Sequence, residues 1–142
     1  MHRENGTLAD VNLSKSRAIG KMKATITQRF VIDGIHIDVE CDCRFIFFCK
    51  KIGDSWKANY VKLFYEKDKV VPVDGQNIPK GVFDKKELDK YPEGYQYLAA
   101  AQATLGHPIL NDLPNAMNKG FFKMYESMED WMQGKDVNLY WE

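Results

Sequence analysis

The side chains that could carry chemistry are few and scattered along the sequence. There are three histidines, His2, His36 and His107. No glycine-rich phosphate loop, GxSxG nucleophile motif or HExxH zinc motif occurs, and no metal-ligand set has usable spacing. Spacing alone therefore defines neither a catalytic constellation nor a metal site.

Each of these side chains has an ordinary structural interpretation. His2 is nearly terminal, where a side chain is usually mobile, and His36 falls on a charged strand face. His107 follows Gly106 at the end of an expected helix, where a histidine complements the helix dipole. Gln28 is the one polar residue on an apolar strand face. It is either a buried amide satisfied within the protein or a group that orients a ligand.

Composition narrows the classes of partner. Twenty basic and twenty acidic residues give a net charge of zero, which argues against nucleic acid as a partner. Cys41, Cys43 and Cys49 share one expected strand, and an odd count without CxxC predicts free buried thiols in a reducing compartment. No secretory signal or apolar run of about 20 residues occurs, so we expect a cytoplasmic protein without a membrane partner.

Three long alternating segments, 18–30, 35–49 and 56–66, would position these groups. Asp33-Gly34 suits a two-residue type I′ hairpin turn between the first two. Pairing Ile32 with Ile35 then sorts apolar from charged side chains. The inward pairs are Phe30–Ile37, Gln28–Val39, Ile26–Cys41, Ala24–Cys43 and Met22–Phe45. The outward pairs are Arg29–Asp38, Thr27–Glu40 and Thr25–Asp42, with Lys23 diagonal to Asp42. The three acidic residues form a row of carboxylates, which we interpret as a structural salt-bridge ladder because Arg29 and Lys23 face it.

The rest of the chain predicts a single α+β domain, residues 1–142, with a sheet core over 1–73 and a helical tail over 81–142. A short strand is expected at 7–13, a connector at 67–79, and helices at 84–91, 95–105 and 116–133. The Met and aromatic stripe of the last helix is interpreted as core or lid packing rather than as a surface for a cofactor or partner. Strands of about a dozen residues must twist and coil, so their apolar face needs a cover or encloses a pocket.

The order of several short motifs resembles a known family. These motifs are a histidine and a Gly-Thr pair near the start, Arg17-Ala18-Ile19-Gly20, a strand ending Gln28-Arg29-Phe30, and the run Cys49-Lys50-Lys51-Ile52-Gly53-Asp54-Ser55-Trp56-Lys57. Over residues 1–66 they resemble the scytalone dehydratase-like branch of the SnoaL/NTF2-like superfamily. Residues 91–141 also resemble small fungal members of this superfamily, which are often encoded beside biosynthetic genes.

The resemblance implies a fold and a chemistry. The fold is a cone, a strongly curved antiparallel sheet around a pocket that helices close. The enzymes of the family are lyases, isomerases or cyclases of secondary metabolite biosynthesis. They act without a cofactor on small polyketide- or terpenoid-like molecules, by general acid–base catalysis in an apolar cavity. The expected partner is thus a small hydrophobic molecule, and a homodimer is compatible with the family.

When the family's site residues are aligned with this sequence, some are matched and others are replaced. His2 matches one of two catalytic histidines, and the other falls on Gln28, which cannot act as a base near neutral pH. A ligand-binding serine–asparagine pair falls on Cys43 and Phe45. The family's apolar pocket positions map to Ala24, Ile26, Val61, Leu63 and Tyr65, and strand parity adds Met22, Val39, Cys41 and Asn59 to the expected substrate-binding face.

One part of the family pattern has no counterpart in this sequence, namely the amino-terminal helices that supply an aspartate and tyrosines. Two further hypotheses therefore stand beside the enzyme. One is a module that holds a hydrophobic ligand without turnover. The other is an interaction module that dimerises through a sheet face or an exposed helix stripe.

Overall fold

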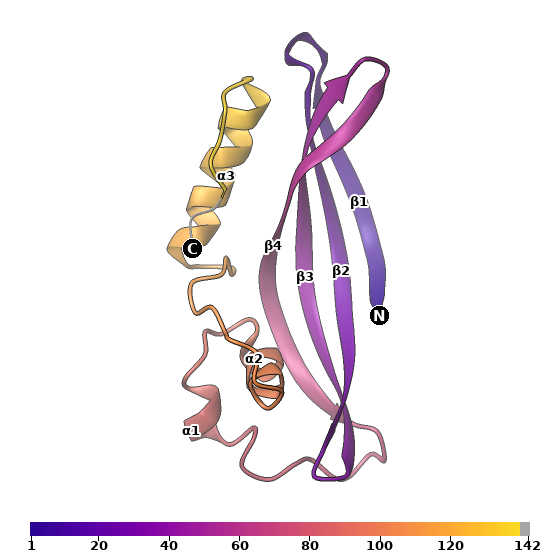
Figure 1. Ribbon diagram of the computed structural model, residues 1–142, viewed down its shortest axis with the longest axis vertical. Coiled ribbons are helices and arrows are strands. Elements are labelled where there is room, and N and C mark those ends of the chain that lie inside the picture. The colour runs from indigo at the N-terminus through magenta and orange to yellow at the C-terminus, as the bar shows by residue number, and fades with distance from the viewer. Residues whose placement is uncertain (140–142) are drawn as a thin grey trace.

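The computed structural model describes residues 1–139 and has an α+β fold. One antiparallel sheet of four strands is followed by helices that lie along it (Figure 1). The sheet has the order β1-β2-β3-β4, so β1 and β4 are its two edges and the sheet is open. The strands are β1 (His2–Asn12), β2 (Arg17–Ile32), β3 (Ile35–Ile52) and β4 (Ser55–Pro72), and the helices are α1 (Lys85–Leu88), α2 (Gln96–Ala103) and α3 (Lys119–Met132).

The central hairpin has the predicted register. Asp33 and Gly34 form its turn with φ values of 52° and 75°, and Ile32 pairs with Ile35. All the predicted pairs of both faces follow from that one pair. Positive φ at two successive residues is the condition for a type I′ turn, which explains why this dipeptide fixes the pairing.

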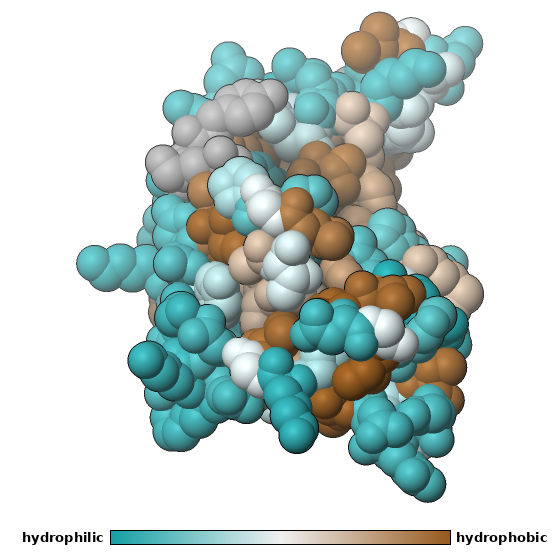
Figure 2. Space-filling model, turned by 60° about the horizontal axis from the view of Figure 1, so that its bottom comes forward, coloured by the Kyte–Doolittle hydropathy of each residue, from teal (hydrophilic) through white to brown (hydrophobic). Residues whose placement is uncertain are grey.

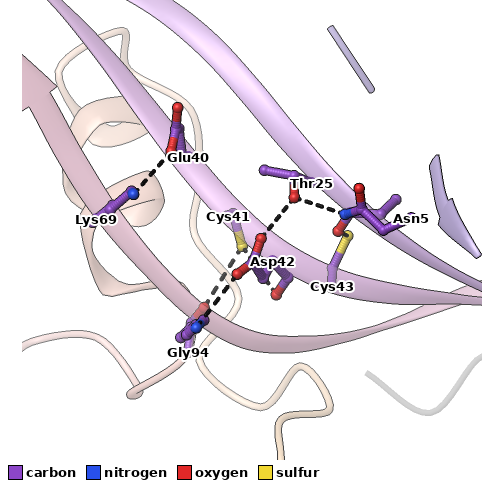
Figure 3. A network of polar contacts seen from close by, with 10 residues as sticks. Asn5, Thr25, Glu40, Cys41, Asp42, Cys43, Lys69 and Gly94 are labelled. Carbon is purple, nitrogen blue, oxygen red and sulfur yellow. Dashed lines mark hydrogen bonds and ion pairs between the residues drawn. The ribbon is translucent and has the colours of Figure 1, made fainter. Parts of the chain in front are cut away.

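Polar side chains on the outward face link all four strands (Figure 3). Thr25 Oγ1 donates to Asp42 Oδ1 at 2.7 Å and accepts from Asn5 Nδ2 at 3.0 Å. Lys69 pairs with Glu40 at 3.2 Å, beyond the point where β4 was expected to end. The expected connector at 67–79 is therefore wrong over its first part, because β4 continues to Pro72 and the half-buried Val70 packs against the cluster that contains Ile37 and Val39.

The helices begin later and end earlier than their sequence patterns predicted. Asp84 precedes α1, but its side chain makes no capping hydrogen bond, and α1 is a single turn of four residues. Asn118 sets the start of α3, since its side-chain oxygen accepts from the N–H of Phe121 at 3.1 Å. None of these described helices is long and apolar enough to cross a membrane.

The buried face of the sheet changes along the strands, whereas the sequence predicted a single inward face. In the lower half Ala24 and Cys43 are buried in a cluster with Ala99 of α2. In the upper half the buried residues are Phe48 and Phe64, which pack with α3. Phe48 lies an odd number of positions from Cys43 on β3, so it points to the opposite face.

The chain reaches that opposite face by passing the outer edge of β4. There the N–H of Tyr65 donates to the carbonyl of Pro114 at 2.9 Å. As a result α2 lies beside the lower half of the twisted sheet and α3 beside its upper half (Figure 1). Because the two helices cover opposite faces, the expectation of one continuous inward face is correct only for the lower half.

The surface at the lower end of the molecule is mixed in character. Seen with this end forward, apolar side chains form patches between hydrophilic ones (Figure 2).

The core beneath α3 is mainly aromatic. The Trp131 ring meets Phe48 and Tyr60 edge-on at 5.8 and 6.0 Å between centroids. The guanidinium of Arg17, 6% exposed, lies 3.9 Å from the same indole and donates to the carbonyl of Gly134 at 3.3 Å. Most of the Met and aromatic stripe of the last helix is thus core, as predicted.

Candidate functional site

A cavity of about 360 Å³ lies between the sheet and α2 with the loop that follows it, and we call it the inner pocket. Its polar lining residues come from three strands, from α2 and from the residue that precedes α2. They are His2, Gln28, Tyr65, Tyr95 and Gln102. The rest of the lining is apolar and consists of Ile26, Leu98, Ala99, Pro108, Ile109, Leu110 and Leu113. An apolar cavity with a few convergent polar groups is the usual form of a small-molecule site.

The pairing of β1 with β2 brings His2 to this cavity. His2 lies opposite Ile26, and its ring is 5.6 Å from that of Phe45. The terminal amine donates to the carbonyl of Thr27 at 2.7 Å, and the Thr27 N–H donates to the carbonyl of Met1 at 2.8 Å. The ordinary expectation of a mobile terminal histidine is therefore wrong, and the exposed imidazole lies on an ordered strand at the pocket.

Gln28 belongs to a chain of side-chain hydrogen bonds at one end of the pocket. Gln102 Nε2 donates to Gln28 Oε1 at 2.6 Å, and His107 Nδ1 lies 2.5 Å from Gln102 Oε1. His107 therefore contacts the Gln102 side chain, whereas the sequence indicated only a role at a helix end. Gln28 was interpreted either as an amide satisfied within the protein or as a group that orients a ligand. The hydrogen bond from Gln102 agrees with the first interpretation for the amide oxygen.

Two tyrosines form another wall of the pocket. Their rings, Tyr65 and Tyr95, are 5.0 Å apart, and the Tyr95 hydroxyl donates to the carbonyl of Leu110 at 2.8 Å. Burial raises the pKa of Tyr95 to about 12 and raises the pKa of Tyr65 above its ordinary value. Both hydroxyls consequently stay protonated near neutral pH and can donate hydrogen bonds.

Asp68 holds the beginning of α2 against the sheet. Its Oδ2 accepts from the N–H of Leu98 at 2.8 Å. Burial nevertheless raises the pKa of Asp68 to about 6, because desolvation outweighs the backbone hydrogen bonds that favour the charged form. Asp68 faces Cys41 across the β3–β4 pair and supports the helix that lines the pocket.

The raised pKa of Asp68 predicts a pH-dependent stability. The folded protein binds this proton more tightly than the unfolded chain, so the stabilisation is complete below pH 4 and falls as pH rises through 6. We expect the difference in unfolding free energy between the wild type and Asp68→Asn to change by about 2 kcal/mol from pH 4 to pH 7. Urea unfolding at both pH values measures it, and a constant difference would contradict the assigned burial.

Burial raises the pKa of all three cysteine thiols and so disfavours the reactive thiolate form. All are free, with Cys41 and Cys43 buried. Burial raises the pKa of Cys41 strongly and that of Cys43 to about 11, so both stay protonated near neutral pH. Within residues 1–139 no cluster of three or more histidine, cysteine or acidic side chains could hold a metal ion.

The structure divides the sequence-predicted site residues into groups. His2, Gln28, Ile26 and Tyr65 line the inner pocket. The buried residues of the lower sheet are Ala24, Val39, Cys41 and Cys43. Met22, Phe45 and Leu63 are half-buried, whereas Asn59 and Val61 are exposed. Asn59 was expected to face the interior, but it is the extra residue at a register shift, where Phe48 pairs with Tyr60 and Cys49 with Ala58.

Sequence reasoning missed the part of the site that comes from α2 and its neighbourhood. Tyr95, Leu98, Ala99 and Gln102 recur at helical spacing, which places them on one face of the chain around α2. That spacing was visible in the sequence. The spacing does not predict, however, that this face packs against the strand that carries Gln28.

A second cavity, of about 450 Å³, lies at the edge of β4 beside the start of α3. Val61, Leu63 and Leu113 form its apolar part, and Lys62, Lys119 and Lys123 part of its polar lining. Tyr65 also contributes to it. It contains no histidine, so we assign the candidate site to the inner pocket.

Comparison with known proteins places this chain among fungal relatives. No family model matches the sequence. It is 40% identical over 147 residues to a PEP2-like protein of Fusarium vanettenii and 40% identical over 147 residues to the pea pathogenicity protein 2 of the same species. It is 41% identical over 152 residues to an uncharacterized protein of Emericella nidulans.

These similarities extend over 98% of this chain. The chain spans only 62%, 63% and 62% of the three relatives' own lengths. It is thus similar, over nearly its whole length, to part of these longer fungal proteins.

Proposed function

We propose that this protein is a cofactor-independent lyase, isomerase or cyclase. Its substrate would be a small polyketide- or terpenoid-like molecule of secondary metabolism, bound in the inner pocket. The observation that carries the proposal is that His2 and Gln28, which lie on different strands, line the same apolar cavity. The fungal origin of the relatives is compatible with this role.

The proposed reaction requires one general base and hydrogen-bond donors at a carbonyl oxygen. A lyase, isomerase or cyclase acting beside a carbonyl begins by moving a proton from the adjacent carbon. The His2 imidazole can accept that proton and return it at another position. Hydrogen-bond donors at the carbonyl oxygen stabilise the enolate that develops, and the tyrosine hydroxyl of Tyr65 and the amide of Gln28 have the right chemistry for that role.

The fold and the thiols support the same proposal. Long twisted strands with α2 against one face would give the cone of the SnoaL/NTF2-like superfamily its concave side and pocket. Three free cysteines fit a reducing cytoplasm, where we place the activity.

A reaction-class assay tests the proposal without knowledge of the natural substrate. We expect the protein to catalyse exchange of the methyl protons of 2-acetylnaphthalene for deuterium in D₂O, because this reports proton abstraction beside a carbonyl. Replacement of His2 by alanine should slow the protein-catalysed exchange at least about tenfold, since general base catalysis contributes that much or more. Proton NMR of the acetyl signal measures the rate.

The control for this assay is His36→Ala, because His36 is exposed and lies outside the inner pocket. The His36→Ala variant should catalyse the exchange of the acetyl protons at the wild-type rate. Equal rates for His2→Ala and the wild type would remove His2 from the mechanism.

A non-catalytic hydrophobic-ligand carrier is the second candidate. It is favoured by the hydrogen bonds that Gln28, Gln102 and His107 make with one another, since such a chain orients a ligand without moving protons to it. Binding of 2-acetylnaphthalene in the pocket without any catalysed exchange would establish this carrier in place of the enzyme.

A further inference from the structure

We propose that Gln102 and His107 are positioning residues that turn the N–H groups of the Gln28 amide toward the inner pocket. The site then selects molecules that present a carbonyl or carboxylate oxygen beside an apolar body. The inference rests on the proposed function, because it takes the inner pocket to be the binding site, and it adds what that pocket recognises.

The direction of the hydrogen-bond chain follows from the groups that compose it. Gln102 donates through Nε2 to Gln28 Oε1 at 2.6 Å, which leaves its own Oε1 facing His107 Nδ1 at 2.5 Å. An amide oxygen can only accept, so the hydrogen of this second bond is on Nδ1. The imidazolium and the neutral Nδ1–H tautomer both satisfy this condition.

This hydrogen-bond chain fixes the orientation of the Gln28 amide. Its oxygen is occupied by Gln102, and no described residue accepts a hydrogen bond from its Nε2. An amide held by its oxygen offers two N–H donors, and the matching ligand group is an acceptor. The apolar lining that includes Ile26, Leu98 and Ala99 would hold the rest of the molecule.

The position of this chain in the structure explains why it can act on the pocket from outside. Gln28 and Gln102 line the inner pocket and also an outer cavity of about 500 Å³, where His107 joins them. The three side chains therefore cross the wall between the two cavities. His107 is exposed and does not line the inner pocket, and the hydrogen bond of its ring to Gln102 connects its side chain to that pocket.

Two probes of matched shape isolate the donor. 2-Acetylnaphthalene carries a carbonyl that 2-ethylnaphthalene replaces with a methylene group. For the wild type we expect the ketone to bind about 3–10-fold more tightly, the value of one net hydrogen bond. The measured quantity is the ratio of the two dissociation constants, obtained by NMR titration.

The variants test each link of the chain. Gln102→Leu and His107→Gln should both bring the ratio close to one. In His107→Gln, which leaves the lining of the inner pocket intact, the affinity for 2-ethylnaphthalene should also stay within about twofold. His107→Asn should keep the wild-type ratio, because an asparagine Nδ2 replaces the imidazole Nδ1 as donor, whereas a glutamine Nε2 corresponds to the other ring nitrogen. His107 is exposed, so its variants keep the test valid if Gln102→Leu fails to fold.

The outcomes separate this inference from the proposed function. An unchanged ratio in both Gln102→Leu and His107→Gln would overturn the positioning role and leave the pocket in place. Equal loss of the ratio in His107→Asn and His107→Gln would also overturn it. If the wild type binds neither probe, the proposed pocket fails and the inference fails with it.

Discussion

Phe64→Ala is expected to lower the free energy of unfolding by about 3–5 kcal/mol, the usual cost of removing a buried phenylalanine ring. Phe64 is fully buried, and its ring lies 5.3 Å from that of Phe121 and 5.7 Å from that of Tyr125. The Arg44 guanidinium lies over the Phe64 ring, 5.0 Å from its centroid. The truncated side chain would leave a cavity between the sheet and α3.

Val61→Ala on the same strand is the matched control. Val61 is 48% exposed, so its truncation should cost about 0.5 kcal/mol or less. Denaturant unfolding of the two variants measures the difference. Equal costs, or a larger cost for Val61→Ala, would contradict the finding that the upper sheet is covered on the face that bears Phe64.

Gly94→Ala is expected to destabilise the protein by about 4 kcal/mol, through backbone strain and a steric clash together. Gly94 has a φ of 108°, a conformation that L side chains rarely adopt, and an added Cβ would lie 2.7 Å from the carbonyl oxygen of Tyr65. The Cys41 thiol also donates to the Gly94 carbonyl at 3.6 Å (Figure 3). Moving this backbone would disturb Tyr65 and hence the inner pocket.

Gly106→Ala separates the two causes. Gly106 has a φ of 77°, but an added Cβ there would meet nothing within 4 Å. It should therefore cost only the strain, about 1–2 kcal/mol. Thermal or urea unfolding of both variants gives the comparison. Equal destabilisation would show that the close approach of Gly94 to Tyr65 does not constrain the fold.

The central hairpin could be predicted from sequence because its information is local. Asp33-Gly34 specifies the turn, and one pairing decision then places every side chain of 16 successive pairs between Arg17 and Ile32 and their partners. The opposite charges of Arg29 and Asp38 agree with that decision, and their side chains do pair in the structure. A slip by one residue would instead turn every side chain of the strand to the opposite face of the sheet.

The change of buried face could not be predicted in the same way. Ile46 and Phe48 are apolar, but so are Phe45 and Phe47 beside them, so the alternation of β3 disappears in this stretch. Which of the two sets is buried depends on where α3 packs, and that contact lies more than 70 residues away in sequence, as in the ring pair of Phe48 and Trp131. A strand apolar on both faces contains no local signal for the choice.

The candidate site was predictable only where strands build it. Strand parity placed Gln28 and Ile26 on the pocket face, and the family resemblance singled out His2. Gln102 and His107 were not predicted, because their role depends on the docking of α2 against β2 and on an amide orientation that no sequence pattern encodes. The strand parity of Asn59 was lost at a register shift in β4.

The position of a bound probe shows whether the inner pocket is the binding site. We would titrate 2-acetylnaphthalene into methyl-labelled protein and record intermolecular nuclear Overhauser effects. The inner-pocket account predicts contacts with the methyl groups of Ile26, Leu98 and Ala99. Contacts confined to Val61 and Leu63 would place the ligand in the cavity at the edge of β4 and contradict the account.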